Sequence, residues 1–231
     1  MREIRKSSSY TGIAVAIFLI LLWASSLTVL FSVEVSFSNP LTWLGILLQT
    51  HLFTGMFITA HDAMHGSVYP KNIKVNHLIG KICTALFMFN SYKTLKPKHY
   101  LHHRFAGTEK DPDFHKGNPG FWRWYLDFLK EYISVKQFVL VAIVFNLLLL
   151  IVPQTNLLLF WVIPSILSTL QLFYFGTYMP HMGEHAPDNR HKAHSQSKNH
   201  MVAFLTCYFF GYHYEHHDAP ATPWWQLWRM K

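Results

Sequence analysis

Four long apolar stretches constrain this chain more than any other feature of its sequence. They cover residues 11–33, 41–60, 135–152 and 157–178. A helix needs about 20 apolar residues to cross the hydrocarbon core of a bilayer, so we expect an all-α integral membrane fold with four transmembrane helices. Pro164 in the fourth is compatible with a kinked span. Residues 78–89 are amphipathic and contain Lys81, which favours an interfacial helix.

The composition agrees with a membrane protein. The chain is 51% hydrophobic and 14% charged, against roughly 25% charged in soluble domains. Its net charge of +8 does not indicate a nucleic-acid partner, because the basic residues flank apolar runs and form no recognition motif. Cys83 and Cys207 form no CxxC pair, so neither a disulfide framework nor a thiolate metal site is predicted.

The positions of the basic residues predict the topology. All 20 Lys and Arg residues lie before the first apolar stretch, in the central segment up to the start of the third, or after the fourth, and the connections 34–40 and 153–156 contain none. Since Lys and Arg are retained on the cytoplasmic side, we expect a multi-pass protein of the cell inner membrane with both termini and the central segment in the cytoplasm. The first stretch is interpreted as an uncleaved anchor rather than a signal peptide. Residues 1–231 are interpreted as one membrane-embedded domain.

Histidine is unusually frequent and its positions are patterned. The 16 histidines outnumber the 12 carboxylates, and eight of them form three clusters with helical spacing: His61-Asp-Ala-Met-His65, His99-Tyr-Leu-His102-His103 and His213-Tyr-Glu-His216-His217. Residues at i, i+3 and i+4 share a helix face, so each cluster is expected to present two or three imidazoles to one metal ion. Pro97 lies just ahead of the second cluster and suits the start of the helix that carries it.

The predicted topology brings all three clusters to the cytoplasmic side, where they form a histidine-rich cap. Imidazole suits Fe, Zn, Cu and Ni, and eight ligands are enough for two ions with an open position left for oxygen or substrate. No HExxH or ExxH motif occurs, so neither a zincin protease nor a carboxylate-bridged di-iron bundle is indicated. The alternative is a set of interfacial histidines that bind no metal.

The order of boxes HxxxH, HxxHH and HxxHH around paired apolar stretches resembles the membrane fatty acid desaturase and hydroxylase superfamily. The finer pattern is similar to the bacterial β-carotene ketolases from about Leu41 to the C-terminus. This resemblance is carried by His61-Asp-Ala-Met-His65-Gly66, Asp111-Pro-Asp-Phe-His115, Phe175-Gly-Thr-Tyr-Met-Pro-His181, Gly183-Glu-His185, Leu205-Thr-Cys-Tyr, Phe210-Gly-Tyr-His213-Tyr-Glu-His216-His217 and Pro223-Trp-Trp-Gln-Leu227. Phe105 and Phe209 depart from it, because ketolases often carry histidine there.

The resemblance implies a desaturase-like fold, two iron ions, O2 as co-substrate, a ferredoxin-like electron donor, and a carotenoid or other lipid-soluble substrate drawn from the membrane lipid. The C4 methylene of a β-ionone ring would be oxidised twice and lose water to leave a ketone. It also implies a further ligand after the fourth span, where His181 and His185 are candidates and polar loop residues are the alternative. Pro180 is expected to break the helix ahead of both.

Asp62 and Glu215 lie inside histidine boxes and are candidates for carboxylates that orient imidazoles, with solvated surface residues as the alternative. Asp111 and Asp113 could instead serve loop structure. Two functional alternatives stay open. One is an acyl-lipid desaturase or hydroxylase, or a carotenoid 3-hydroxylase, with the same metal core. The other is a membrane metal carrier, which the sparse polar residues of the spans disfavour.

Overall fold

The described part of the chain is entirely helical. The computed structural model describes residues 10–115 and 120–231, and no strand occurs in these two ranges. Two five-residue segments, η1 and η2, are π-helical. The elements in chain order are α1 (Thr11–Ser32), α2 (Pro40–Met64), α3 (Ile73–Leu86), α4 (Tyr92–Phe105), α5 (Phe121–Tyr132), α6 (Val135–Leu148), α7 (Gln154–Leu157), η1 (Leu158–Val162), α8 (Ile163–Phe173), η2 (Tyr174–Tyr178), α9 (Met179–His181), α10 (His200–Cys207), α11 (His213–Asp218) and α12 (Trp224–Leu227). The all-α expectation is confirmed.

Three helices are long and apolar enough to cross a membrane by themselves. They are α1, α2 and the continuous helix Gln154–His181, which comprises α7, η1, α8, η2 and α9. The expected third span is shorter than predicted, because α6 has 14 residues and is therefore about 21 Å long, less than the roughly 30 Å of a hydrocarbon core. It qualifies only together with α5, from which it is bent by 85°. The expected number of four is reached when this bent pair is counted as one span.

Two prolines shape the helix Gln154–His181. Pro164 and Pro180 lack the N–H that an α-helix needs at these positions, and a π-helical turn ends two residues before each of them. A π turn inserts one extra residue and thereby shifts the hydrogen-bond register. The helix continues through both prolines and ends at His181, after which Met182 is extended. The expectation that Pro180 breaks the helix ahead of His181 was therefore wrong.

Helix α2 lies at the centre of the bundle and is held by packing and by polar contacts. Thr54 Oγ1 lies 2.9 Å from Ser168 Oγ of α8 and donates to Gln171 Oε1 at 2.5 Å. Hydroxyl and amide pairs of this kind stabilise helix association where no water competes. At its N-terminus, Asn39 Oδ1 accepts from Leu41 N and Pro40 occupies the first turn.

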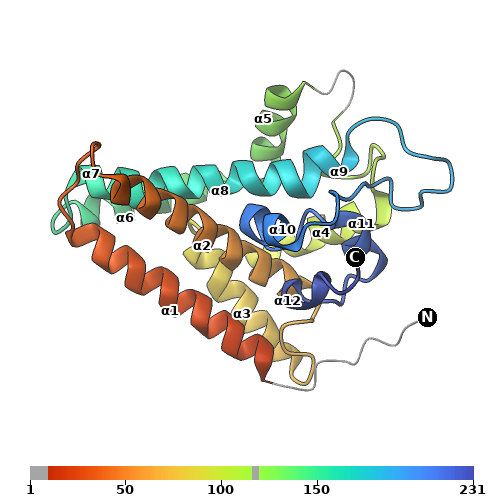
Figure 1. Ribbon diagram of the computed structural model, residues 1–231, viewed down its shortest axis with the longest axis horizontal. Helices are drawn as coiled ribbons and strands as arrows, with labels where there is room; N and C mark the ends of the chain where they lie inside the picture. Colours follow the sequence, from red (N-terminus) through yellow and green to blue (C-terminus); the bar gives the residue numbers. More distant parts are fainter. Residues whose placement is uncertain (1–9, 116–119) are drawn as a thin grey trace.

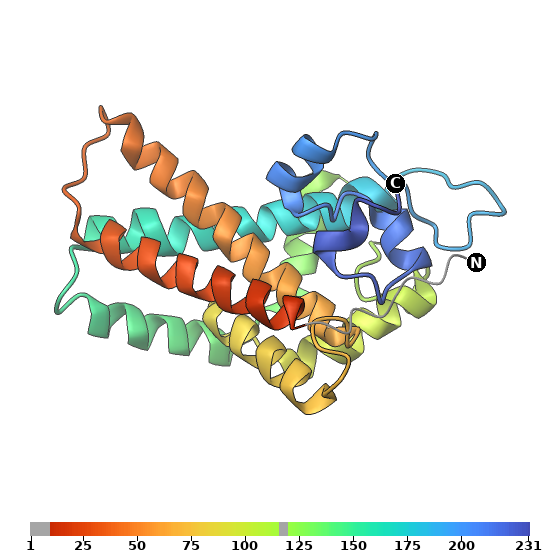
Figure 2. The ribbon, with the colours of Figure 1, turned by 60° about the horizontal axis from the view of Figure 1, so that its bottom comes forward.

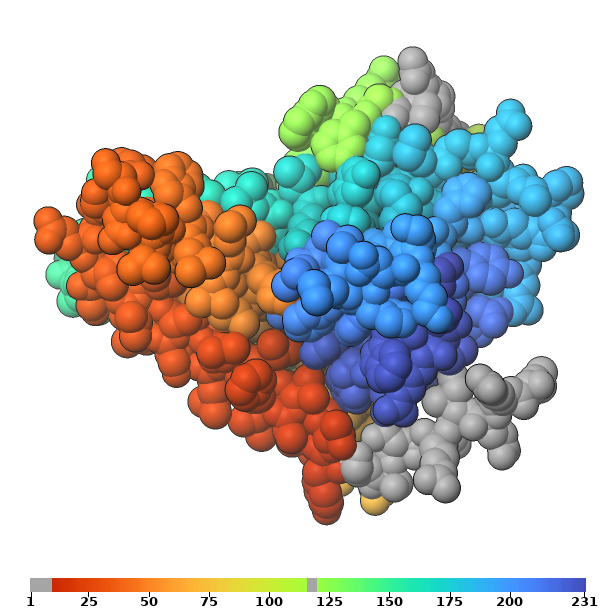
Figure 3. Space-filling model, in the orientation of Figure 1, coloured from red at the N-terminus to blue at the C-terminus, as the bar shows by residue number. Residues whose placement is uncertain are grey.

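The two ends of the bundle differ. The α1–α2 and α6–α7 connections lie together at one end, and α4, α9, α10, α11 and α12 gather at the other (Figure 1, Figure 2). In the space-filling view the C-terminal residues, coloured blue, form a continuous cap beside the spans (Figure 3). The histidine-rich segments therefore share one end of the molecule.

Helices α3 and α4 differ in detail from what the sequence indicates. Helix α3 buries Asn76, Gly80, Cys83 and Thr84 on one face, packs along α2 and also contacts α1. Helix α4 begins at Tyr92 rather than near Pro97. Its start is fixed by the cap Ser91, whose side chain accepts from Thr94 N, so Pro97 lies in the second turn.

Candidate metal centre

Nine histidine side chains converge in two adjacent groups at the cap end of the bundle. Within each group the nearest ring nitrogens of all members lie within 4.8 Å of one another. The first group is His61, His65, His99, His103 and His216, and the second is His102, His181, His213 and His217. Each group combines segments that are more than 100 residues apart in the chain.

The first group is built by the ends of three helices. His61 and His65 lie one turn apart at the end of α2, and His99 and His103 lie one turn apart in α4. The Nε2 atoms of His65 and His99 are 2.6 Å apart, and those of His103 and His216 are 3.0 Å apart. Nε2 of His61 is buried and has no hydrogen-bond partner among the described residues. A buried nitrogen without a partner needs another ligand, and a metal ion would supply it.

The second group is held by α4, α9 and α11. Nε2 of His217 lies 3.1 Å from Nε2 of His102 and 3.0 Å from Nε2 of His213. Nε2 of His181 completes the group, 3.1 Å from Nε2 of His213. Helix α11 can turn back toward the bundle because Tyr208 and Phe209, just after α10, both adopt left-handed backbone conformations.

The two HxxHH boxes are each divided between the groups. In α4, His99 and His103 belong to the first group and His102 to the second, whereas in α11 His213 and His217 belong to the second and His216 to the first. Residues at i and i+4 are separated by about 40° around a helix, but those at i+3 and i+4 by about 100°. The expectation that each cluster serves one metal was therefore wrong for both HxxHH boxes.

The spacing of the nitrogens fits metal ligands. Two nitrogens about 2.1 Å from one ion and at a right angle are about 3 Å apart, which matches the separations of 2.6 to 3.1 Å in these groups. Facing Nε2 atoms cannot all be donors, since a neutral imidazole carries a single N–H. Neither group contains a carboxylate among its described members. The donor set of these two groups is therefore purely imidazole and suits a transition metal, while His102 also belongs to a third group with the carboxylates of Asp111 and Asp113.

The second ring nitrogen of several members is fixed by an oxygen atom. Nδ1 of His102 lies 3.0 Å from Asp111 Oδ1, and Nδ1 of His181 lies 2.7 Å from the carbonyl oxygen of Lys192. Asp62 Oδ1 is 3.2 Å from Nδ1 of His61, and its Oδ2 accepts from Trp224 N at 2.7 Å. Such contacts set which nitrogen carries the proton and turn the other toward a metal. Asp62 thus lies where the sequence places an orienting carboxylate.

Glu215 has different neighbours. Its carboxylate accepts from the Ser195 hydroxyl and pairs with Lys231 Nζ at 2.8 Å. It ties α11 to the preceding loop and to the C-terminus, and it contacts no imidazole within the described residues.

Asp111, for which the sequence suggested only a loop role, lies beside His102 and orients its imidazole. The sequence feature that could have indicated this role is the short distance along the chain, since Asp111 follows His102 by nine residues in a short loop.

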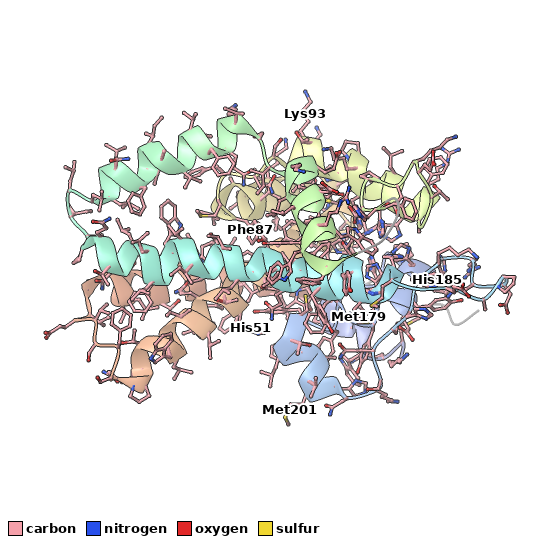
Figure 4. The ribbon with its side chains drawn as sticks, turned by 90° about the horizontal axis from the view of Figure 1, so that it is seen from above. His51, Phe87, Lys93, Met179, His185 and Met201 are labelled. Atoms are coloured by element: carbon pink, nitrogen blue, oxygen red, sulfur yellow. The ribbon has the colours of Figure 1, made fainter. Side chains whose placement is uncertain are left out.

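His185 lies outside both groups. Its ring stacks on His194 with centroids 4.3 Å apart, and its Nε2 is 3.4 Å from the carbonyl oxygen of His181. Figure 4 shows it past the end of the long helix, in the loop that follows Met179. The end of the helix at His181 accounts for this, because the extended chain no longer keeps residues i and i+4 on one face.

Burial keeps most of these imidazoles neutral. Burial, followed by the neighbouring histidines, holds the pKa values of His99, His213, His216 and His217 well below 6.5. Burial lowers the pKa of His65 to about 4 and that of His103 to about 2. His102 differs, since burial lowers its pKa but Asp113 and Asp111 outweigh burial and raise it. Neutral imidazoles at pH 7 are ready to ligate a metal.

An apolar cavity of about 410 Å³ reaches the histidines from the membrane side. His61, His99, His102 and His213 form its inner end, and Asp113 lies beside them. One face of the long helix lines it from Val162 to Thr177. Phe138 of α6 and Ile166 of α8 line it and are also exposed, at 65% and 55%. These two residues mark a lateral mouth that a lipid-soluble molecule could enter.

Comparison with known proteins gives one family and a consistent set of relatives. A family model described as fatty acid desaturase matches residues 38–140 and 130–231. A β-carotene ketolase of Haematococcus lacustris is 44% identical over 186 residues, 76% of this chain and 58% of the relative. A zeaxanthin 4-ketolase of Chlamydomonas reinhardtii is 38% identical over 239 residues, 95% of this chain and 53% of the relative. A β-carotene ketolase of a Paracoccus species is 42% identical over 190 residues, which are 81% of this chain and 74% of the relative. The chain thus spans little more than half the length of the algal relatives.

Proposed function

The chain belongs to the fatty acid desaturase family, and on this basis we propose that it is a carotenoid ketolase. In this proposal it oxidises the C4 methylene of a β-ionone ring, converting β-carotene to its mono- or diketone. The observation that carries the proposal is the convergence of nine imidazoles, with no carboxylate among them, at the inner end of an apolar cavity. The names of the relatives, β-carotene and zeaxanthin ketolases, support the substrate class.

We propose that each histidine group holds one iron ion. Five nitrogens in the first group and four in the second leave room for oxygen or substrate at an ion that accepts six ligands. Imidazole alone does not separate iron from zinc, copper or nickel, and family membership favours iron. When bound, the iron pair would supply the activation of O2 and the removal of an allylic hydrogen.

The protein residues provide position and a dry environment. Asp111, Asp62 and the Lys192 carbonyl hold three imidazoles in register, which favours a fixed ligand geometry. Phe57, Leu95 and Phe210 line the cavity near the histidines and exclude water from the reacting carbon. Each hydroxylation at C4 consumes one O2, two electrons and two protons and releases one water. The second gives a gem-diol, which loses water to leave the ketone, and a ferredoxin-like donor would deliver the electrons.

The shape of the cavity supports a rod-like substrate. It follows one face of the helix from Val162 to Thr177, a distance of about 22 Å at 1.5 Å per residue. A volume of about 410 Å³ over that length leaves a narrow channel, which suits a single extended polyene. An acyl-lipid desaturase or hydroxylase, or a carotenoid 3-hydroxylase, would use the same metal core, and the relatives give no support for them.

A membrane metal carrier is the second alternative function. It would need ionisable groups along the middle of the spans. Several polar residues described there instead pair with one another, as Thr54 does with Ser168 and Gln171, and as Gln49 does with Ser26. The ionisable His51 of α2 stacks on Tyr208, so these residues do not form a row of ligands for an ion.

We further propose that the histidine groups face the cytoplasm at the inner membrane. The start of α1, the C-terminus and the helices α4, α9 and α11, which carry histidines of both groups, lie toward the same end of the bundle (Figure 1, Figure 2). The connections at the other end, 34–40 and 153–156, contain no Lys or Arg. Retention of positive charge on the cytoplasmic side supports this orientation, which also places the groups within reach of a soluble electron donor.

Expression in bacteria that accumulate β-carotene tests the function. The pigment should redden, and each modified ring should gain one oxygen and lose two hydrogens by mass spectrometry. His216→Ala should abolish product and lower bound iron while the protein still inserts into the membrane. Unchanged pigment together with altered fatty acids would contradict the ketolase proposal in favour of the acyl-lipid reading. Full activity of the His216 variant would contradict its role as a ligand.

A further inference from the structure

A second apolar cavity lies beyond the one that reaches the histidines. It has a volume of about 260 Å³ and is lined by α1, the end of α3 with the turn that follows it, α6 and η1. All of its described lining residues are apolar. A cavity with this lining stays dry and favours an apolar occupant over water.

The two cavities are neighbours, because consecutive residues of the chain line one and then the other. After α3, Met88 lines the first cavity and Phe89 the second. On the long helix, Val162 lines the first and its neighbour Trp161 the second. The lining of the two cavities therefore changes over between adjacent residues on both walls.

Helix α6 provides the third wall of both cavities. Val141 lines the first cavity, and Val144 and Leu148 line the second. These positions are three and four residues apart and form one stripe on the helix. None of the 14 residues of α6, all of them described, is buried. Val141, Val144 and Leu148 are partly buried against the hydrophobic core, so this stripe faces the bundle and borders both cavities.

We propose that the second cavity binds the far end of the substrate polyene while the ring at its near end faces the histidine groups. The proposal rests on the proposed ketolase function and names where the rest of the molecule lies. Along α6 the lining continues from Gln137 in the first cavity to Leu148 in the second, a distance of about 16 Å at 1.5 Å per residue. A rigid polyene with a ring at each end would thus lie along the inner face of α6, with its far end beside Val144 and Leu148.

The turn after α3 marks the boundary between the two halves of this path. Met88 and Phe89 have φ values of 52° and 59°, a left-handed conformation that costs a residue with a side chain about 1–2 kcal/mol. The turn is held by the hydrogen bond from Phe89 N to the Ala85 carbonyl oxygen at 2.8 Å. Strained backbone of this kind is typical of ligand clamps, and here it directs two consecutive side chains to the two cavities.

Filling the second cavity tests the proposal. The measurement is kcat/KM for β-carotene and for a truncated polyene that carries the same ring and about half of the chain. Wild-type protein should favour the full-length substrate by at least about tenfold, because burying each additional CH2 group favours binding severalfold. Val144→Trp and Leu148→Trp should bring the preference close to one, by lowering kcat/KM for the full-length substrate.

Ile143→Trp is the matched control. Ile143 is 51% exposed and next to Val144 in α6 but does not line either cavity, so this variant should keep the wild-type preference. An unchanged preference in both filling variants, or no preference in wild type, would overturn the proposal and place the far end in the bilayer through the mouth at Phe138 and Ile166. Oxidation of neither substrate by wild type would count against the ketolase function itself.

Binding to metal-free protein provides a readout without activity. Trp23 and Trp161 line the second cavity, and a conjugated polyene bound between them should quench their fluorescence. A double variant, Trp23→Phe with Trp161→Phe, should lose part of the quenching by the full-length polyene and none of that by the truncated one. Equal quenching of wild type and double variant by the full-length polyene would overturn the proposal even if the ketolase function stands.

Discussion

The carboxylate of Asp111 lies 3.0 Å from Nδ1 of His102, and its second oxygen accepts from Gly107 N at 3.0 Å. The loop after α4 is thereby folded back onto a proposed metal ligand. Loss of such an orienting contact typically lowers metal affinity about 10- to 100-fold. We therefore expect Asp111→Ala to lower iron content, measured by elemental analysis of purified protein, and ketone formation with it.

Two further variants sharpen this test. Asp111→Asn keeps an oxygen acceptor and should retain more iron than Asp111→Ala. Asp188→Ala removes an exposed carboxylate from the loop after α9 and should leave iron content unchanged. If Asp111→Ala bound iron as tightly as wild type, the contact with His102 would have no part in holding the metal.

His181 and His185 form a matched pair four residues apart. His181 belongs to the second group, whereas His185 stacks on His194 outside it. His181→Ala should abolish metal binding by the second group and with it product formation, because only three of its four imidazoles would remain. His185→Ala should change neither. Iron content and product analysis check both, and equal losses in the two variants would contradict the ligand set proposed above.

Gly55 is required by a close approach between α2 and Tyr208. A Cβ atom at Gly55 would lie 2.5 Å from Cζ of the Tyr208 ring, and this buried ring is stacked on His51 with centroids 4.3 Å apart. Ala ordinarily stabilises a helix interior by about 1 kcal/mol over Gly, but overpacking a core costs about 1–3 kcal/mol. We expect the clash to prevail, so that Gly55→Ala lowers Tm in detergent by several degrees.

Gly120→Ala is the control for this comparison. Apart from its neighbours in the chain, no described residue has an atom within 4 Å of a Cβ added at Gly120, which precedes α5. Its Tm should stay close to that of wild type. A Gly55→Ala protein more stable than wild type would mean that Tyr208 can move aside.

The stability of metal-free protein should fall as the pH drops below about 6.5. In the folded state burial lowers the pKa of His65 to about 4, so between pH 6.5 and 4 the unfolded chain binds a proton that the folded chain does not. Each such group lowers the free energy of unfolding by up to about 1.4 kcal/mol per pH unit in that window. His103 extends the effect below pH 4, since burial lowers its pKa to about 2.

Thermal unfolding of chelator-treated protein across pH 5 to 8 checks this dependence. Above pH 6.5 these histidines are neutral in both states and contribute no slope. His65→Gln should reduce the loss of stability between pH 6.5 and 5, because one buried imidazole is gone. A metal-free protein that became more stable on acidification would contradict the predicted sign.

Much of this protein could be predicted from local sequence. The apolar lengths of residues 11–33 and 41–60 indicate α1 and α2 because a bilayer admits only helices whose backbone bonds are satisfied internally. The topology likewise predicts that histidine boxes before the third stretch and after the fourth return to one end. That prediction needs only the parity of the crossings and no knowledge of packing, and the two groups at the cap end agree with it.

Other features were decided only by the tertiary structure. The division of His99, His102 and His103 between two groups depends on where α11 docks against α4, which no spacing rule contains. The separation of His181 from His185 depends on the end of the helix at His181, one residue after Pro180, where Met182 becomes extended. Asp111 acquires its role from a loop folded onto His102. Sequence determines what each segment can form, whereas contacts between segments far apart in the chain select one arrangement, because burial and nitrogen–nitrogen geometry exist only once those segments meet.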